Sequence, residues 1–284
     1  MIFDHTPCEL GEGPLWHPER GALFWFDILA GHLHGEGRVR SFGEPASAAG
    51  WIDRARLLVA TSTRLLVLDL ETGAERVLAP LEADDPSTRS NDGRADRQGG
   101  FWIGTMGRRA QAGAGAIYRY HRGELRRLYP GITIPNAIAF TPDGRAAHFT
   151  DTPTRRVMKV ALDAQGWPSG EPETFLDLAA EELNPDGAVI DADGVLWIAQ
   201  WGASRVAAYA PDGSFLRAIA FDAPHTSCPA FGGADLGDLY CTTARENLDA
   251  AGLAAHPDSG KTFVAHGIGR GLPEPRVILP EESA

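Results

Sequence analysis

The same short apolar strand recurs six times along the chain, and this repetition restricts the fold more than any other feature of the sequence. The copies are LFWFDI from Leu23, LLVATS from Leu57, FWIGTM from Phe101, AHFTDT from Ala147, LWIAQW from Leu196 and LYCTTA from Leu239. Their starting residues are 34, 44, 46, 49 and 43 positions apart. A period of about 20–50 residues is typical of an array of similar structural units.

A second strand that ends in a polar turn follows several of these copies. Examples are RLLVLDLETG from Arg64, AIYRYHRG from Ala116, RVMKVALDAQG from Arg156 and RVAAYAPDG from Arg205. The 33 Gly and 20 Pro residues are spread along the whole chain, as expected for many tight turns. We therefore predict an all-β fold, a six-bladed β-propeller of four-stranded antiparallel blades, as a single domain over residues 1–284.

Other folds explain the repeat less well. A β-sandwich does not require the same strand six times at this spacing, and a TIM barrel requires amphipathic helices between its strands. The connecting segments here are Gly, Pro and Asp turns. The only segments in which we expect helix are residues 176–183 and 246–256.

Charge and apolar content exclude several classes of partner. The formal net charge of −12 is spread along the chain, which opposes non-specific binding to nucleic acid or to anionic membranes. The longest apolar run, residues 22–30, contains Asp27, and the N-terminus has no pattern of a secretory signal. Cys8, Cys228 and Cys241 form no CxxC pair and predict reduced thiols. We expect a cytoplasmic protein without an obligate protein partner.

Polar residues occupy one register position in four of the repeats. Ten or eleven residues before the repeated strand stand Glu12, Asn91, Asn136 and Asp186. The corresponding positions in the second and sixth repeats are near Ser47 and Cys228. Equivalent positions of successive blades surround the axis of a propeller, so we expect the four polar side chains to converge at one end of the channel.

Two carboxylates and two amides that face one space form an all-oxygen ligand set. Ca²⁺ and Mg²⁺ prefer such ligands, Mn²⁺ and Fe²⁺ tolerate them, and no His or Cys is placed to select Zn²⁺. Each residue also lies beside Gly or Pro, in GEGP, SNDG, IPNA and NPDG, so a turn or cap role is the alternative for each one alone.

Several longer segments resemble those of the senescence-marker-protein/gluconolactonase/luciferin-regenerating (regucalcin-like) family. They are GEGPLWHPERGALFWFDI, RSNDGRADRQGGFWIGTMG, IPNAIAFTPDGR, NPDGAVIDADGVLWIAQWGASRV, CPAFGG with LYCTTA, and GLPEPRV. The resemblance extends from about residue 8 to about residue 278. It implies a six-bladed propeller with one divalent metal ion in its channel and, in most members, a lactone hydrolase.

The resemblance also implies roles for individual residues. The metal-binding Glu, Asn and Asp of the family correspond to Glu12, Asn136 and Asp186, and Asp186 is also the catalytic base. The substrate-holding Arg and Asn of the R-x-N-D-G motif correspond to Arg89 and Asn91. Ca²⁺ is the leading candidate for the metal, with Zn²⁺, Mn²⁺ and Fe²⁺ as alternatives.

One segment departs from the family pattern. Vertebrate members carry an acidic lid residue shortly after the G-T-M segment, where this chain has Gly107, Arg108 and Arg109. Trp201 and residues 150–152 are candidates for the mouth of the site, with strand packing and a turn as their alternatives.

These observations predict metal-dependent hydrolysis of a sugar (aldono-) lactone to the aldonic acid. Asp186 would take a proton from the attacking water, and Arg89 and Asn91 would orient the hydroxyl groups of the substrate. Two alternatives stay open. One is a non-catalytic calcium-binding regulatory protein, and the other is a lactonase or esterase of non-sugar esters.

Overall fold

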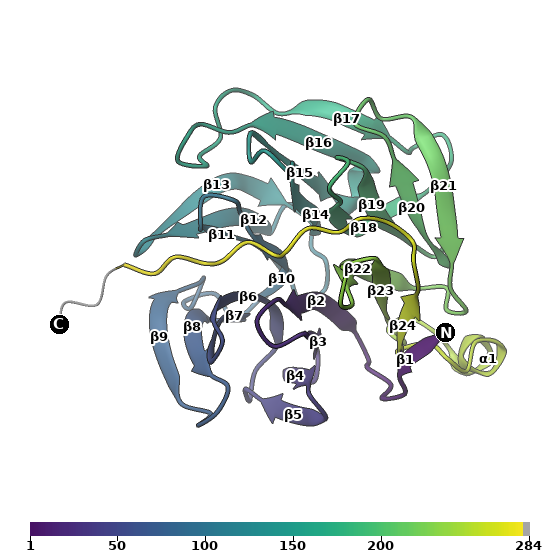
Figure 1. Cartoon of the computed structure of the whole chain (residues 1–284), viewed down its shortest axis with the longest axis horizontal. Helices are drawn as coiled ribbons and strands as arrows, with labels where there is room; N and C mark the ends of the chain where they lie inside the picture. Colours follow the sequence, from purple (N-terminus) through teal and green to yellow (C-terminus); the bar gives the residue numbers. More distant parts are fainter. Residues whose placement is uncertain (281–284) are drawn as a thin grey trace.

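The computed structural model describes residues 1–280 and confirms the six-bladed β-propeller (Figure 1). Each blade is a four-stranded sheet with antiparallel neighbours, and the first strand of each blade lies nearest the axis. Blades one to three consist of β2 (Gly11–His17), β3 (Ala22–Asp27), β4 (His32–Gly35) and β5 (Arg38–Ser41); β6 (Ala46–Asp53), β7 (Arg56–Thr61), β8 (Arg64–Asp69) and β9 (Glu75–Pro80); and β10 (Thr88–Ala95), β11 (Phe101–Gly107), β12 (Gly115–His121) and β13 (Glu124–Ile132).

The remaining three blades follow in the same order around the axis, and the last is built from both ends of the chain. They consist of β14 (Pro135–Phe140), β15 (Ala146–Asp151), β16 (Arg156–Ala161) and β17 (Glu173–Asp177); β18 (Asn184–Ile190), β19 (Leu196–Trp201), β20 (Arg205–Tyr209) and β21 (Phe215–Ala220); and β22 (Thr226–Gly232), β23 (Asp238–Thr243), β24 (Thr262–Ala265) and β1 (Ile2–Asp4). Strand β1 pairs with β24 through Ile2 and Phe263, so the N-terminus closes the ring.

The repeated strand of the sequence is the second strand of every blade. It is buried on both faces, because neighbouring blades pack against it from either side. Phe101, Trp102 and Ile103 of β11 are fully buried, whereas the outermost strand β13 consists of exposed and half-buried residues. Trp25 and Trp197 occupy equivalent second strands and are buried as well. This difference in burial explains why the second strand is the clearest part of the repeat in the sequence.

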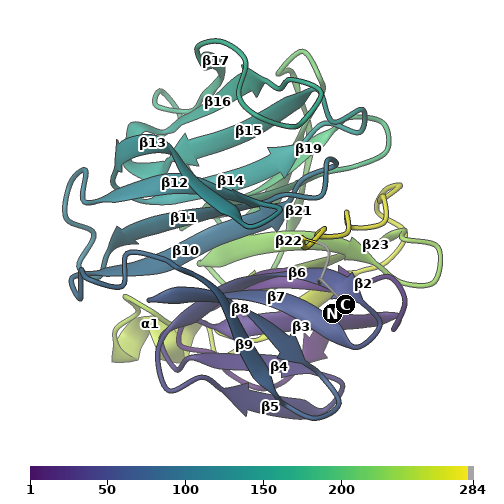
Figure 2. The same ribbon diagram turned by 90° about the vertical axis from the view of Figure 1, so that its left-hand side faces the viewer.

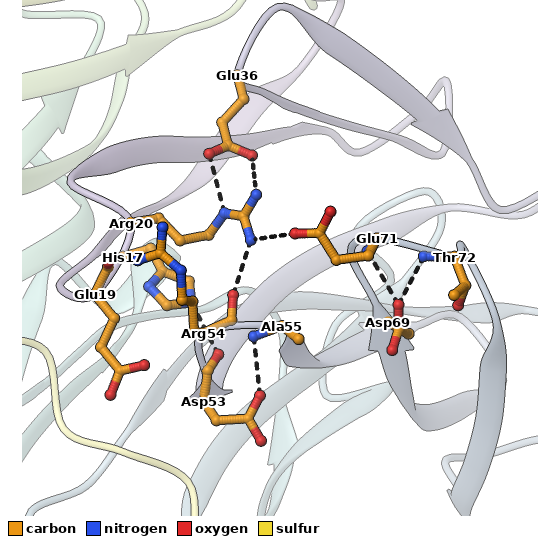
Figure 3. A network of polar contacts seen from close by, with 10 residues as sticks. All are labelled: His17, Glu19, Arg20, Glu36, Asp53, Arg54, Ala55, Asp69, Glu71 and Thr72. Carbon is orange, nitrogen blue, oxygen red and sulfur yellow. Dashed lines mark hydrogen bonds and ion pairs between the residues drawn. The ribbon is translucent and has the colours of Figure 1, made fainter.

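Polar contacts add to the apolar packing between blades one and two (Figure 3). The guanidinium of Arg20 donates to both carboxylate oxygens of Glu36, at 3.0 and 2.7 Å. Its Nη1 atom also donates to the backbone oxygen of Arg54 and to Oε1 of Glu71, at 2.9 and 2.8 Å. The ring of His17 is hydrogen-bonded to the backbone oxygen of Asp53, so this histidine has a structural partner.

Helical structure is scarce in the described residues. Helix α1 (Ala250–Ala255) lies within the predicted segment 246–256, and the side chain of Asp249 accepts from Gly252 N at its N-terminus. A short 3-10 turn, η1 (Thr152–Thr154), follows β15. None of the helices within residues 1–280 has the length and apolar character needed to cross a membrane.

The predicted helix at residues 176–183 is wrong. Its first residues belong to β17, where Leu176 pairs with Val157 of β16 and is buried, and a turn follows. An isolated helix of this length is marginal, because nucleation fixes several residues for one hydrogen bond. Pairing with β16 instead supplies both the backbone hydrogen bonds and a buried position for the leucine.

After β24, residues 266–280, here called the C-terminal segment, cross one face of the propeller (Figures 1 and 2). Ala192 N donates to the backbone oxygen of Arg270, Trp51 Nε1 to that of Glu274, and Ile278 N to that of Gly99, at 2.7–2.8 Å. These partners lie in blades five, two and three. The segment therefore ties several blades together at the face opposite the one on which α1 lies (Figure 2).

The side chain of Glu274 anchors the C-terminal segment to the channel. It forms an ion pair with Arg94, whose Nη2 also donates to the backbone oxygen of Pro229 at 3.4 Å. Both members of the pair are buried. Arg94 and Pro229 lie on the innermost strands β10 and β22, so the segment covers this end of the channel.

The three cysteines are free thiols, as the sequence predicted, and all are buried.

Candidate functional site

A cavity of about 390 Å³ opens at the uncovered end of the channel. It receives residues from the innermost strands and from the loops beyond them. Its lining is Leu10, Glu12, Arg89, Asn91, Met106, Arg108, Arg109, Ala110, Ile134, Asn136, Thr152, Asp186, Trp201, Glu246 and Asn247. The structure thus brings together every candidate site residue of the sequence, namely Glu12, Arg89, Asn91, Asn136 and Asp186.

Local backbone irregularities lie at the four register positions. In each of the innermost strands β2, β10, β14 and β18 the pairing with the second strand shifts beside the polar residue. The shifts fall between Glu12 and Leu15, Ser90 and Gly93, Asn136 and Ala139, and Pro185 and Ala188. A β-bulge of this kind bends a strand and redirects its side chains, and such bulges are frequent beside functional sites.

Glycines allow the innermost strands to approach one another closely. Gly13, with φ +54°, lies where a Cβ atom would come within 2.2 Å of the backbone oxygen of Ser47 in the next blade. A Cβ atom at Gly187 would lie 2.3 Å from Sγ of Cys228. Neither position leaves room for a side chain. The glycines that follow Glu12 and Asp186 therefore belong to the geometry of the ring.

A chain of hydrogen bonds orients the two amides. Arg89 Nη1 donates to Asn91 Oδ1 at 2.8 Å, and Asn91 Nδ2 donates to Asn136 Oδ1 at 3.0 Å. Asn136 Nδ2 donates to Thr152 Oγ1 at 3.0 Å, and this hydroxyl donates to the backbone oxygen of Pro185 at 2.8 Å. The chain runs from blade three to blade five. Because a carbonyl oxygen has two lone pairs, Asn136 Oδ1 can still accept or coordinate a ligand.

The two carboxyl groups are buried beside each other. Glu12 and Asp186 are only 4% and 5% exposed. Burial raises the pKa of Asp186 well above its usual value, and the charge of Glu12 raises it further. Burial also raises the pKa of Glu12, with an added contribution from the carboxylate of Asp92. Repulsion among buried carboxylates disfavours their ionised forms, and a cation between them has the opposite effect.

The donor set suits a hard divalent cation. Glu12 and Asp186 offer carboxylate oxygens and Asn136 offers an amide oxygen, which are the ligand types of Ca²⁺ and Mg²⁺. Within residues 1–280 no three His, Cys, Asp or Glu side chains form a group that could hold a metal ion. A site here therefore depends on the asparagine as well as on the two carboxylates.

Arg89 is buried within the cavity wall. Burial lowers the pKa of its guanidinium, and the charges of Glu246 and Glu12 oppose this shift. Its Nη1 atom also donates to the backbone oxygen of Ser90, at 2.9 Å. Among the contacts described for residues 1–280, Nη1 is the hydrogen-bonded atom of this guanidinium, so Nε and Nη2 remain available to a ligand.

The sequence reasoning missed Glu246 and Asn247 as lining residues. Glu246 is half-buried, and burial raises its pKa while the charge of Arg89 lowers it. Its backbone oxygen is hydrogen-bonded to the ring of His225, which stacks on Trp201 with 4.2 Å between ring centroids. A signal was present in the repeat. Glu246 lies seven residues after the start of the sixth repeated strand, as Arg108 does after the third.

Comparison with known proteins finds similar proteins along most of the chain. Residues 10–245 match the model of the SMP-30/Gluconolactonase/LRE-like region. A protein from Rhizobium meliloti named as a sugar lactone lactonase is 44% identical over 268 residues, which is 92% of this chain and 91% of the relative. A 6-deoxy-6-sulfogluconolactonase from Pseudomonas putida is 33% identical over 95% of both chains.

A solved structure is also similar along almost the whole chain. It is a calcium-binding protein, regucalcin, from Agrobacterium tumefaciens, with 41% identity and a TM-score of 0.95 over 98% of this chain and 97% of its own. The matched model spans the innermost strands β2, β10, β14 and β18, which carry the polar residues of the cavity. The protein belongs to the SMP-30/gluconolactonase/LRE-like family.

Proposed function

We propose that this protein hydrolyses a sugar (aldono-) lactone to the aldonic acid with the help of one divalent cation. The observation that carries the proposal is a pair of buried carboxylates, Glu12 and Asp186, in one cavity. The same cavity contains the hydrogen-bonded amide of Asn136 and the guanidinium of Arg89, which still has N–H groups available to a ligand. The relatives named as lactonases support the same reaction. The cavity volume of about 390 Å³ lies in the range of small-molecule sites.

Glu12, Asn136 and Asp186 would hold the cation. Ca²⁺ leads because all three donors are oxygen atoms and because the similar solved structure is described as a calcium-binding protein. Mn²⁺, Fe²⁺ and Zn²⁺ are the alternatives. When bound, the cation would polarise the lactone carbonyl as a Lewis acid.

Asp186 is the proposed general base. Its carboxylate would take a proton from water as the water oxygen bonds to the carbonyl carbon. The bond between this carbon and the ring oxygen then breaks, and the proton passes to the ring oxygen as the hydroxyl of the acid. The positive charge of a bound cation would offset the negative charges of Glu12 and Asp186. The carboxyl group of Asp186 would then stay ionised, as a general base must be.

Arg89 and Asn91 are the proposed substrate-holding residues. Arg89 has Nε and Nη2 free for substrate oxygens, and its Nη1 bond to Asn91 fixes the plane of the guanidinium. Oriented donors reduce the freedom of the bound substrate and hold the carbonyl in line with the attacking water. These residues would therefore act mainly on substrate binding and orientation.

A second candidate function is calcium binding without turnover. The description of the similar structure as a calcium-binding regucalcin favours it. Arg89 favours the enzyme, because a protein that only stores a cation needs no guanidinium beside it. The many charged residues of the cavity oppose a site for apolar, non-sugar esters.

The test is a pH-indicator assay of lactone opening by chelator-treated protein. Glucono-, galactono- and xylonolactones are each supplied with Ca²⁺, Mn²⁺, Zn²⁺ or Fe²⁺, and every rate is corrected with a protein-free blank that contains the metal. Restoration of turnover by one cation, and its loss in Glu12→Gln protein, would support the proposal. Measurable cation binding without turnover on any lactone would favour the calcium-binding alternative.

A further inference from the structure

Two arginines from one loop stand at the rim of the cavity. Arg108 and Arg109 follow β11 directly and are exposed to solvent, yet both line the cavity that contains Asp186. The loop turns back at once, because Ala110 N donates to the backbone oxygen of Gly107 at 2.8 Å and Ala110 has φ +52°. This tight turn places two neighbouring guanidinium groups at one side of the opening.

Neither rim arginine forms an ion pair with a carboxylate of residues 1–280. Arg108 Nε donates to the backbone oxygen of Pro86 at 2.9 Å, which fixes the side chain without neutralising it. For Arg109 the described contact is made by its backbone nitrogen, which donates to Gln111 Oε1 at 3.0 Å. Two uncompensated positive charges at the site are notable in a chain with a formal net charge of −12.

The other charges of the cavity balance one another. If the proposed function is correct, a divalent cation offsets Glu12 and Asp186. The negative charge of Glu246 raises the pKa of Arg89 against the effect of burial, so the charges of these two groups offset each other. Outside the cavity, near the covered end of the channel, Arg94 forms an ion pair with Glu274, and the nearby buried carboxyl group of Asp92 adds one more acidic group there. The excess positive charge of the opening therefore belongs to Arg108 and Arg109.

We infer that the preferred substrate is a lactone with a second acidic group at the end of the molecule remote from the lactone carbonyl. A carboxylate or phosphate there would meet Arg108 and Arg109 while the carbonyl lies beside Asp186. Guanidinium groups present planar pairs of N–H donors that match the oxygen pairs of such anions. This inference rests on the proposed function and names the substrate class of the same site.

Specificity would arise mainly from binding. A neutral aldonolactone places a hydroxymethyl group where the acidic lactone places its anion, and a hydroxymethyl group gains no charge-assisted hydrogen bond. Because the rim is exposed, dissolved salt would screen the attraction of the anion to the arginines. A preference for an anion should consequently appear in KM and should weaken with ionic strength.

The experiment compares two γ-lactones that differ only in the terminal group. Glucaro-γ-lactone carries a carboxylate where glucono-γ-lactone carries a hydroxymethyl group. A second comparison tests a phosphate: glucono-δ-lactone phosphorylated on its terminal hydroxyl group is compared with unphosphorylated glucono-δ-lactone. Cation-loaded wild-type protein is compared with the double variant Arg108→Gln/Arg109→Gln. The matched control is Arg122→Gln/Arg145→Gln, which removes two exposed arginines from turns at the covered end of blades three and four.

We expect kcat/KM for one acidic lactone to be at least about tenfold higher than for its neutral partner. The difference should come from a lower KM for the acidic lactone. The rim variant should lose this preference and keep its rate on the neutral lactone, and the control variant should resemble the wild type. Salt should reduce only the rate on the acidic lactone. The lactone that gains most identifies the anion.

Two results would overturn the inference. A neutral lactone that is hydrolysed as well as both acidic lactones would contradict it and leave the proposed function intact. So would a rim variant that loses activity equally on charged and neutral lactones. Hydrolysis of no lactone by cation-loaded protein would instead overturn the proposed function, and this inference with it.

Discussion

Asn91 donates a hydrogen bond from Nδ2 to Oδ1 of Asn136, with 3.0 Å between the two atoms, across the boundary between blades three and four. The bond links a proposed substrate-holding residue to a proposed cation ligand. Because Asn91 also accepts from Arg89, movement of one side chain alters the position of all three. The site therefore acts as one connected polar unit rather than as separate binding groups.

Replacement of Asn91 by Ala removes the centre of this unit. Arg89 Nη1 and Asn136 Oδ1 would each lose a partner, at a cost of about 1–3 kcal/mol for each buried group left without one. We expect a kcat/KM at least about tenfold lower on the best lactone, measured with saturating cation. Asn184→Ala is the control, since Asn184 begins β18 but does not line the cavity. Unchanged kinetics in Asn91→Ala would contradict the connected unit.

Replacement of Asp186 by Asn removes the proposed base and keeps the size of the side chain. We expect kcat to fall by about 10²–10⁴-fold, the usual contribution of general base catalysis, together with weaker cation binding. Rates from the indicator assay and cation binding by calorimetry provide the two measurements. Asp193→Asn in the same blade, beyond the cavity, should behave as the wild type. Wild-type turnover in Asp186→Asn would exclude the residue as the base.

Replacement of Arg89 by Ala should act on binding more than on the chemical step. Loss of a charge-assisted contact to substrate corresponds to about 1.5–3 kcal/mol, so KM should rise by about ten- to a hundredfold while kcat changes little. The control is Arg155→Ala, whose guanidinium bonds to Asn184 outside the cavity. An equal fall of kcat and kcat/KM would instead assign Arg89 to the transition state.

Removal of the carboxylate of Glu274 should destabilise the fold. In Glu274→Ala the guanidinium of Arg94 remains buried without its ion-pair partner, which costs about 3–5 kcal/mol. Urea unfolding followed by tryptophan fluorescence measures the change. Glu124→Ala breaks an exposed pair with Arg126 and should cost less than about 1 kcal/mol. Equal effects of the two substitutions would show that burial of the first pair is energetically unimportant.

His148 should make the protein sensitive to acid. Burial lowers the pKa of its ring to about 3, with an added effect of Lys159, and neither ring nitrogen has a hydrogen-bond partner within residues 1–280. The unfolded chain takes up the proton near the ordinary histidine pKa of about 6.5, so acidification below that value favours unfolding. The linked loss of stability between about pH 7.5 and pH 5.5 is about 1.4 kcal/mol.

Urea unfolding at these two pH values provides the measurement. His148→Gln protein should lose less stability on acidification than the wild type, because glutamine does not titrate. The control is His5→Gln, at an exposed position near the N-terminus, which should keep the acid sensitivity of the wild type. If His148→Gln shows the same pH dependence as the wild type, the histidine does not carry the effect.

The sequence predicted the ring of blades well because the second strands are buried on both faces. Residues such as Phe101 and Trp102 must be apolar there, and the same requirement recurs in every blade. The register argument succeeded for a related reason. Equivalent positions such as Asn136 and Asp186 surround one axis, so their spacing in the sequence specifies where they meet in space.

The remaining features depend on contacts that no local pattern records. Arg94 and Glu274 are 180 residues apart, and nothing near either residue identifies the other as its partner. Residues 176–183 have a composition that suits a short helix, but the partner strand β16 decides that Leu176 is in a strand. Glu246 lies seven residues after the start of its repeated strand, as Arg108 does, and both residues line the cavity. The two residues lie in different loops, so the shared spacing alone does not identify Glu246.

The C-terminal segment also affects the direction from which a small molecule can reach the cavity. Glu274 and its neighbours cover one end of the channel, and the cavity lies at the other end, with Arg108 and Arg109 in its lining. A ligand that enters or leaves on this side passes close to the two guanidinium groups. If the protein opens an acidic lactone as proposed, the product carries one more carboxylate than the substrate, so the two guanidinium groups that attract the substrate would also slow the release of the product.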